Sequence, residues 1–296
     1  MYISFSCFYT ITGLARRKKM AFELLPEDCF VQILSTTTPR DACRASVVSS
    51  TFQSLADADA VWDKFLPSDW QQILYRLVNP VEYSSKKDLF LRLCNPQLID
   101  GGRKIFSLEK STGRKCYVLS ARELSITWAH NPRYWTWKQF PESRFPEVAE
   151  LRTVWWLEIN GSINTSLLSP KTVYGAYLIL KLAPRAYGLD SLPSEVTVEA
   201  GAFKSQGSVY LRREDSSKQY IEQVYCLNRV EALRSRVSEG EKRGLWMCQD
   251  GWIEVELGSF YNDGRIGAVK MSLKEVKGNH LKGGLIVGGI EIRPKY

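Results

Sequence analysis

The feature of this chain that most limits its fold is a change in apolar periodicity near residue 98. Before that point apolar side chains follow a helical spacing, as in residues 70–77. Beyond it they alternate with period two, as in residues 173–182. Because helices precede strands without alternating with them, the sequence predicts two domains of different class rather than one α/β sheet.

The charge of the chain is unevenly distributed. Its 296 residues suit two domains, and the net charge is +8. Residues 1–19 hold four basic side chains, residues 20–99 hold seven basic and ten acidic ones, and the remainder holds 29 basic and 22 acidic ones. A basic C-terminal half permits nucleic-acid binding. No long basic run occurs after residue 19, however, so a solvated surface of mixed charge is favoured and a nucleic-acid partner is not expected.

Cysteine usage and hydropathy indicate the compartment. Seven cysteines occur and none belongs to a Cys-x-x-Cys pair, which argues against a disulfide framework and a zinc site and favours a reducing, cytoplasmic and nuclear setting. No apolar run reaches the length of a membrane helix. Residues 1–19 place Arg16-Arg17-Lys18-Lys19 after an apolar stretch, the reverse of a secretory signal. They are expected to be a disordered tail or, preferably, an extension upstream of a working start at Met20.

Helix start and stop signals punctuate the first half. Pro26, with acids after it, suits a first helical turn. Thr38 can cap a second helix, with proline and aspartate following at the favoured positions. Ser68 is predicted to cap a later helix that ends at Asn79-Pro80, and residues 86–93 are predicted to form a last helix. Residues 68–98 are thus expected to link the two domains.

Short motifs follow one another in the first half: Leu25-Pro26-Glu27-Asp28, Ile33-Leu34-Ser35, Pro39-Arg40-Asp41, Leu55 and Val61-Trp62. With these motifs residues 24–66 resemble an F-box, and residues 20–67 are therefore assigned to an F-box module. Where F-boxes usually carry Cys-Lys-x-Trp, this chain has residues 49–52, with Phe52 in the aromatic place.

The F-box resemblance implies binding to a Skp-type adaptor and a cullin scaffold. A three-helix unit this small cannot bury all its apolar surface, so it can offer a face to a partner. The residues expected on that face are Leu25, Pro26, Ile33, Leu34 and Trp62, some of which must also hold the core. The alternative is a helical cap on the second domain.

Short alternating segments in the second half predict an antiparallel β-sandwich over residues 99–296. They lie at residues 173–182, 195–199, 252–257 and 285–292, separated by glycine, proline and Asn-Asp-Gly turns. Gly288-Gly289 within the last segment indicates a β-bulge. The predicted fold class is therefore α+β: a short helical module followed by an antiparallel, jelly-roll-like β-sandwich.

Six segments stand in order along the second half: residues 125–128, 133–137, 145–151, 156–159, 251–258 and 284–294. With these segments the second half resembles the phloem protein 2 domain, which is known from the tobacco agglutinin class of plant lectins. Combined with an F-box, it is similar to a plant subfamily of substrate receptors in Skp–cullin–F-box ubiquitin ligases. It implies that the domain binds glycans that contain N-acetylglucosamine, or related glycans, on nuclear and cytosolic proteins.

Candidate sugar-binding residues follow from the chemistry of sugars and from the resemblance. Sugars pack their C–H faces on indole rings and need a few fixed polar groups. Five of the nine tryptophans lie between residues 128 and 156, and the resemblance points to Trp128 and Trp135. Glu254 and Glu256 share one strand face and could accept sugar hydroxyls. The alternatives are that both tryptophans are core residues and that both glutamates line a water-exposed strand face; Trp156 is expected in the core.

The sequence carries no recognisable catalytic constellation. It has two histidines, no phosphate-binding loop, no Gly-x-Ser-x-Gly and no metal-ligand spacing. We therefore expect an adaptor without a catalytic site, cofactor or metal. It is expected to bind its targets, as glycosylated proteins, through the lectin-like domain. The alternative function is a carbohydrate- or protein-binding module without a role in ubiquitin ligation.

Overall fold

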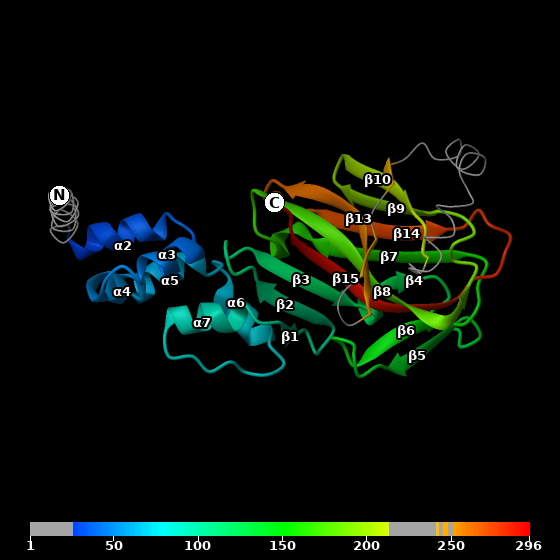
Figure 1. Cartoon of the computed structure of the whole chain (residues 1–296), viewed down its shortest axis with the longest axis horizontal. Helices are drawn as coiled ribbons and strands as arrows, with labels where there is room; N and C mark the ends of the chain where they lie inside the picture. The colour runs from blue at the N-terminus through cyan, green and yellow to red at the C-terminus, as the bar shows by residue number, and fades with distance from the viewer. Residues whose placement is uncertain (1–25, 213–240, 243–244, 248–250) are drawn as a thin grey trace, which may run out of the picture. The chain divides into compact units, whose positions relative to one another are not determined.

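The computed structural model describes residues 26–212, 241–242, 245–247 and 251–296 (Figure 1). The chain divides into two compact units. The helical unit holds the described residues up to Ser68 together with 82–92 and 110–113, and the sheet unit holds 69–81, 93–109 and the described residues from Arg114 onward. Short helices are thus followed by a large antiparallel sheet domain, which confirms the predicted fold class. Residues 1–19, predicted to be an extension, lie outside the described residues.

Short helices build the helical unit: α2 (Glu27–Ser35), α3 (Pro39–Ala45), α4 (Ser50–Ala56), α5 (Asp59–Phe65) and α7 (Lys86–Leu93). The predicted cap at Thr38 is confirmed, because its hydroxyl oxygen accepts from the Asp41 N–H at 3.2 Å. Ser49 caps α4 in the same way by accepting from the Phe52 N–H at 3.3 Å. Helices of two turns depend on such caps, each of which contributes about 1 kcal/mol.

Aromatic rings fill the core of the helical unit. Trp62 is buried and donates its indole N–H to the Ala56 carbonyl at 2.7 Å. Its ring lies 5.2 Å from that of Phe90. Phe52 packs edge-to-face on Phe30 with the ring centroids 4.5 Å apart. The departure from the usual F-box sequence at residues 49–52 therefore supplies both a helix cap and an aromatic core contact.

The sheet unit contains β1 (Gln97–Ile99), β2 (Lys104–Leu108), β3 (Lys115–Ser120), β4 (Ser125–Ile126), β5 (Trp135–Gln139), β6 (Glu147–Leu151), β7 (Leu157–Asn164), β8 (Thr172–Tyr187), β9 (Ser194–Ala200), β10 (Phe203–Val209), β11 (Glu241–Lys242), β12 (Leu245–Met247), β13 (Ile253–Asn262), β14 (Ala268–Glu275) and β15 (Gly283–Pro294). Single turns of 3-10 helix occur at η1 (Ala121–Glu123) and η2 (Thr165–Leu167). The four predicted strand segments correspond to β8, β9, β13 and β15.

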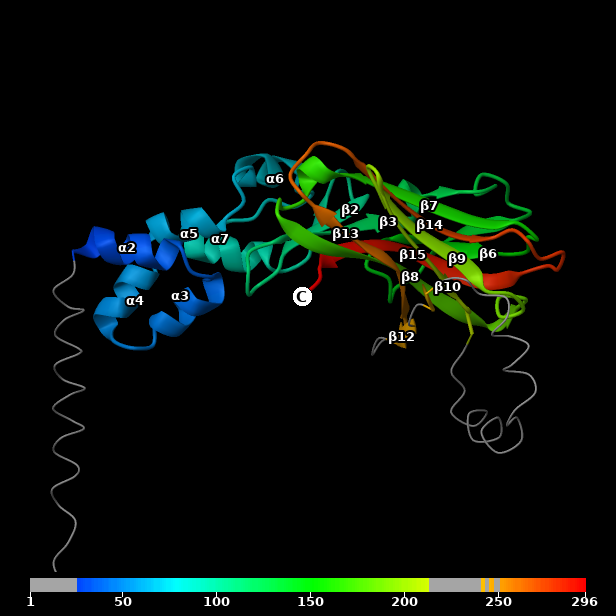
Figure 2. The same cartoon turned by 90° about the horizontal axis from the view of Figure 1, so that it is seen from above.

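Two sheets face each other in the sheet unit (Figure 2). A nine-stranded sheet has the order β1-β2-β3-β15-β8-β13-β12, with β6 and β5 added beside β15. A six-stranded sheet has the order β11-β10-β9-β14-β7-β4. Among the described strands every ladder is antiparallel except that between β10 and β11. Antiparallel pairing joins strands that are distant in sequence, so β8, β13 and β15 become central neighbours.

Strand β8 lies in the middle of the nine-stranded sheet. Leu178 and Leu180 are buried on one of its faces. On the other face, Tyr177 and Ile179 are also buried, in a second apolar cluster that includes Trp252. The strand therefore has apolar residues on both faces over part of its length.

The predicted bulge at Gly288-Gly289 is confirmed by a shift in the β15–β8 register between Val287 and Gly289. A Cβ atom on Gly289 would overlap the carbonyl of Leu119 on β3. Glycine is therefore needed there for the close approach of two backbones.

Helix α6 (Trp70–Arg76) belongs to the sheet unit. The Arg76 guanidinium donates two hydrogen bonds to the Asp100 carboxylate, at 2.8 and 2.9 Å. The predicted helix end at Asn79-Pro80 is wrong, because Leu77 leaves the helix to bridge with Ile99. The predicted Ser68 cap is also wrong: Asp69 holds the N-cap position, and its side chain forms an ion pair with Lys115 at 2.7 Å.

Candidate glycan site

A strained turn follows β4 and carries Trp128. The backbone of Trp128 has φ +60°, in the left-handed region that bulky residues rarely occupy. The Trp128 carbonyl accepts from the Asn131 N–H at 2.9 Å, and the Ala129 N–H donates to the Ile126 carbonyl at 3.1 Å. Such strain persists only where the surroundings hold it, and it is concentrated at functional sites.

Two indole N–H groups from β5 hold this turn. Trp135 donates to the Thr127 carbonyl at 3.1 Å, and Trp137 donates to the Ala129 carbonyl at 3.2 Å. The two acceptors flank Trp128 in sequence. Trp135 is buried, so the alternative that it is a core residue agrees with its position. Its indole supports the turn and presents no open face for stacking.

Three aromatic rings meet at the turn. The Trp128 ring lies 5.1 Å from the Tyr134 ring with an interplanar angle of 36°, and 6.1 Å from the Trp155 ring with an angle of 71°. Trp128 and Tyr134 are half-buried, whereas Trp155 is 53% exposed. The prediction that Trp156 is a core residue is wrong. It is 41% exposed, because residues 152–156 form an irregular connection before β7 rather than a strand.

A carboxylate missed by the sequence reasoning lies beside the turn. The Glu158 carbonyl on β7 accepts from the Thr127 N–H at 3.0 Å, and its carboxylate accepts from Trp156 at 2.9 Å and from Asn160 at 3.2 Å. With an ion pair to Lys274 at 2.9 Å, these bonds lower the pKa of Glu158 to about 2. The Lys274 bond is the largest cause. Glu158 is therefore a fixed anion. Only the segment 156–159, seen as part of a family pattern, could have indicated it.

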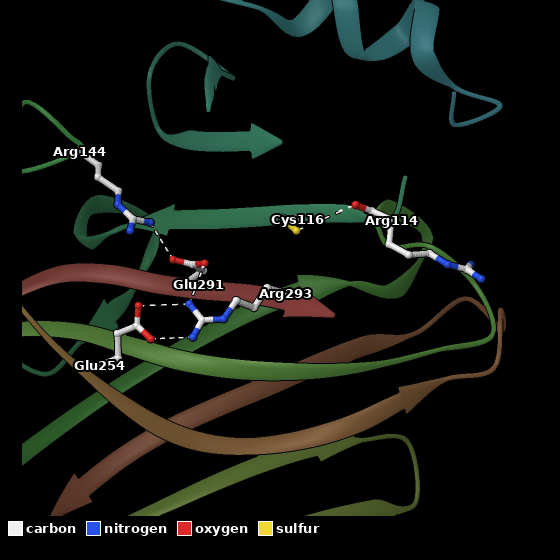
Figure 3. Close-up of polar contacts among 6 residues, drawn as sticks. All are labelled: Arg114, Cys116, Arg144, Glu254, Glu291 and Arg293. Carbon is white, nitrogen blue, oxygen red and sulfur yellow. Dashed lines mark hydrogen bonds and ion pairs between the residues drawn. The ribbon is translucent and has the colours of Figure 1, made fainter. Parts of the chain in front are cut away.

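Glu254 and Glu256 lie elsewhere, in a row of ion pairs on the nine-stranded sheet. Figure 3 shows the part of this row that contains Glu254. Glu254 accepts two hydrogen bonds from Arg293, at 2.6 and 3.1 Å, and Glu256 accepts one from Lys295 at 2.6 Å. Both glutamates are buried, so the alternative of a water-exposed strand face is wrong. Strand β15, which lies on the other side of β8, supplies the cations that pair with β13, and these partners cannot be identified from the β13 sequence alone.

Arg293 is the centre of this ion-pair row. It also pairs with Glu291 at 3.0 Å, and Glu291 pairs with Arg144 at 2.7 Å, as Figure 3 shows. Burial acts to lower the pKa of the Arg293 guanidinium, but the bonds and charges of Glu254 and Glu291 outweigh burial and raise it. The row therefore stays charged, and every acid in it already has a basic partner. This arrangement suits a stable sheet face better than a sugar site.

The Trp128 turn and the pair Glu254 and Glu256 are too far apart to contact the same sugar residue. Strand β5 is separated from β13 by β6, β15 and β8. Four strand spacings of about 4.8 Å amount to roughly 19 Å. The structure therefore brings Trp128 and Trp135 together and leaves Glu254 and Glu256 at a separate position.

The predicted adaptor-binding residues divide between surface and core in the helical unit. Pro26 is exposed and Ile33 is 48% exposed, whereas Leu34 and Trp62 are buried. Leu25 lies outside the described residues. The reason is geometric: Leu34 packs inward from α2, while Ile33, one position earlier, points about 100° away on the helix.

Two exposed valines were missed by the sequence reasoning. Val47 is 85% exposed and Val48 is 59% exposed, between α3 and α4. Two adjacent valines in a short connection between predicted helices are the sequence signal that could have indicated this exposed apolar patch. Together with Pro26 and Ile33 they make a set of four exposed apolar residues of the helical unit, and this set is called its apolar face.

The described residues contain no group of three or more His, Cys, Asp or Glu side chains that could hold a metal ion. Within the same residues no helix is both long enough and apolar enough to cross a membrane. Cys29, Cys43 and Cys116 are free thiols. Burial raises the pKa of Cys116 to about 12, so its reactive thiolate form is disfavoured.

Comparison with known proteins identifies two family patterns. The F-box-like family matches residues 22–68, and the phloem protein 2 family matches residues 114–294. The relatives are proteins of Arabidopsis thaliana. F-box protein PP2-B15 is 46% identical over 92% of this chain and 96% of its own length. F-box protein VBF is 43% identical over 92% and 99%, and F-box protein PP2-B13 is 42% identical over 92% and 98%.

Proposed function

The chain belongs to the F-box proteins that carry a phloem protein 2 domain, and we propose that it is the substrate receptor of a Skp–cullin–F-box ubiquitin ligase. The family supports an adaptor of substrates rather than an enzyme. In this role the chain makes and breaks no covalent bond. It raises the effective concentration of target lysines near a ubiquitin-loaded enzyme.

The apolar face of the helical unit supports docking to a Skp-type adaptor. Ile33, Val47 and Val48 expose apolar side chains on a unit too small to cover them. Leu34 and Trp62 act from within, because they hold the helices that present this face. Receptor and scaffold would meet in the cytoplasm and nucleus, where reducing conditions suit the free thiols.

We place target capture at the Trp128 turn, and the bound group is proposed to be a glycan containing N-acetylglucosamine. The observation that carries this proposal is the left-handed backbone of Trp128, held by the indole N–H groups of Trp135 and Trp137. Aromatic faces can stack on sugar C–H groups while Glu158 accepts a hydroxyl, since a carboxylate has about four acceptor positions. Glu254 and Glu256 are assigned a structural role in this proposal.

Co-purification of the full chain with a plant Skp-type adaptor tests the ligase role. Ile33→Asp and Val48→Asp should each weaken the complex by about 2 kcal/mol, or roughly 30-fold, because they bury a charge in an apolar interface. Tyr75→Asp is the matched control, since Tyr75 is 92% exposed on α6 of the sheet unit. Equal binding by all three variants would exclude this face as the docking site.

A glycan array on the same sample tests target capture. Trp128→Ala should abolish glycan binding and leave the adaptor complex intact. If the folded protein binds the array but not the adaptor, the better account is a lectin-like module without a ligase role. If it binds the adaptor but not the array, glycan capture at the Trp128 turn is excluded and the ligase role stands; if it binds neither, both parts of the proposal fail.

A further inference from the structure

Trp155 is the most exposed ring of the three that meet at the Trp128 turn. It lies between β6 and β7, 27 residues from Trp128 in sequence, and its ring centroid is 6.1 Å from that of Trp128. Its side chain is 53% exposed, whereas Trp128 and Tyr134 are half-buried. A single exposed apolar residue is ordinary, but adjoining apolar side chains mark a candidate binding surface, and here three rings adjoin.

The geometry of the cluster shows which ring is open. Tyr134 lies beside Trp128 with its plane tilted by only 36°, as in an offset stack. Trp155 meets Trp128 at 71°, edge to face. Trp128 is therefore the middle ring, with neighbours on two sides, and Trp155 is the outer ring with the free surface.

Hydrogen bonds from neighbouring groups hold the backbone at Trp155. Val154 and Lys282 exchange two backbone hydrogen bonds, at 2.9 and 2.7 Å. The buried ammonium of Lys282 also donates to the Trp155 carbonyl at 2.7 Å and forms an ion pair with buried Glu275. An exposed ring on a fixed backbone loses little entropy when it binds, so it is pre-organised for contact.

From these observations we infer that Trp155 presents the stacking face of the glycan site, while Trp128 and Tyr134 hold that ring in place. The inference rests on the proposed function and names the residue that contacts the sugar ring. A pyranose offers C–H groups on its faces, and these pack on an exposed indole.

Titration of the full chain with the β1,4-linked trimer of N-acetylglucosamine, followed by calorimetry, tests this inference. Trp155→Ala should weaken binding by about tenfold or more, which corresponds to roughly 1.4 kcal/mol. Trp155→Phe should retain most of the affinity because it keeps an aromatic face. Phe203→Ala is the matched control: Phe203 is also 53% exposed, on β10, outside the ring cluster, and its removal should leave the affinity unchanged.

The outcomes separate this inference from the proposed function. If Trp155→Ala binds the trimer as wild type does while Trp128→Ala does not, the assignment of Trp155 is overturned and glycan capture stands. If wild type binds no glycan at all, the proposed function fails together with the inference. Circular dichroism and adaptor co-purification establish that each variant is folded.

Discussion

Replacing Lys282 with methionine should destabilise the sheet unit by about 3–5 kcal/mol. The two side chains are similar in length, so the loss is electrostatic rather than a packing defect. The Lys282 ammonium pairs with Glu275 and donates to the Trp155 carbonyl at 2.7 Å and the His280 carbonyl at 3.3 Å. Methionine would leave the buried Glu275 carboxylate without its cation, with the Gly278 N–H at 2.9 Å as its remaining donor among these contacts.

A double-mutant cycle isolates the pair. Glu275→Gln removes the carboxylate instead, and the cost should be smaller, because the Lys282 ammonium keeps its hydrogen bonds to the Trp155 and His280 carbonyls. Removing both charges with Lys282→Met and Glu275→Gln should restore stability to within about 1–2 kcal/mol of wild type. The two single changes should therefore be strongly non-additive.

Urea unfolding of the full chain, followed by tryptophan fluorescence and circular dichroism, gives these free energies. The two units can unfold separately, so the transition that changes is assigned to the sheet unit. Lys277→Met is the control, because the Lys277 side chain is 78% exposed and its pair with Glu195 should contribute less than about 0.5 kcal/mol. A Lys282→Met variant no less stable than this control would refute the electrostatic argument.

Three further predictions concern single contacts. Hydrogen bonds from Arg76 lower the pKa of Asp100 from 3.8 to about 2. That pairing should contribute about 2 kcal/mol above pH 3.8 and be lost as the pH falls toward 2, so Asp100→Asn should flatten this part of the stability–pH curve relative to wild type. Trp135→Phe should cost about 2 kcal/mol in urea unfolding, because the Thr127 carbonyl loses its donor, and should weaken glycan binding in the folded protein. Thr38→Ala should lower the stability of the helical unit by about 1 kcal/mol in thermal unfolding, whereas Thr38→Ser should not.

Local signals in the sequence identified features that depend on neighbouring residues. The cap at Thr38 needed only the three residues after it, and the bulge at Gly288-Gly289 needed only two glycines in an alternating strand. The change of periodicity near residue 98 separated helices from strands for the same reason. In each case the backbone hydrogen bonds and apolar spacing are set within one element.

The role of a side chain could not be predicted from the sequence where it depends on a residue of another strand. Glu254 looks like a solvent-facing acid along β13, yet Arg293 of β15 buries and pairs with it. Trp135 looks like a ligand-binding ring, yet its N–H holds the carbonyl of Thr127. A strand pattern states that two residues share a face but does not state what covers that face.

The sequence by itself determined the order of helices and strands, the family pattern and the residue types available for a sugar site, because these follow from spacing along the chain. The tertiary structure alone decided which tryptophan is open. Trp128 and Trp155 are distant in sequence and meet because β4, β6 and β7 bring their turns to one place. The exposure of a ring depends on which side chains lie beside it, and strand pairing decides which residues become neighbours.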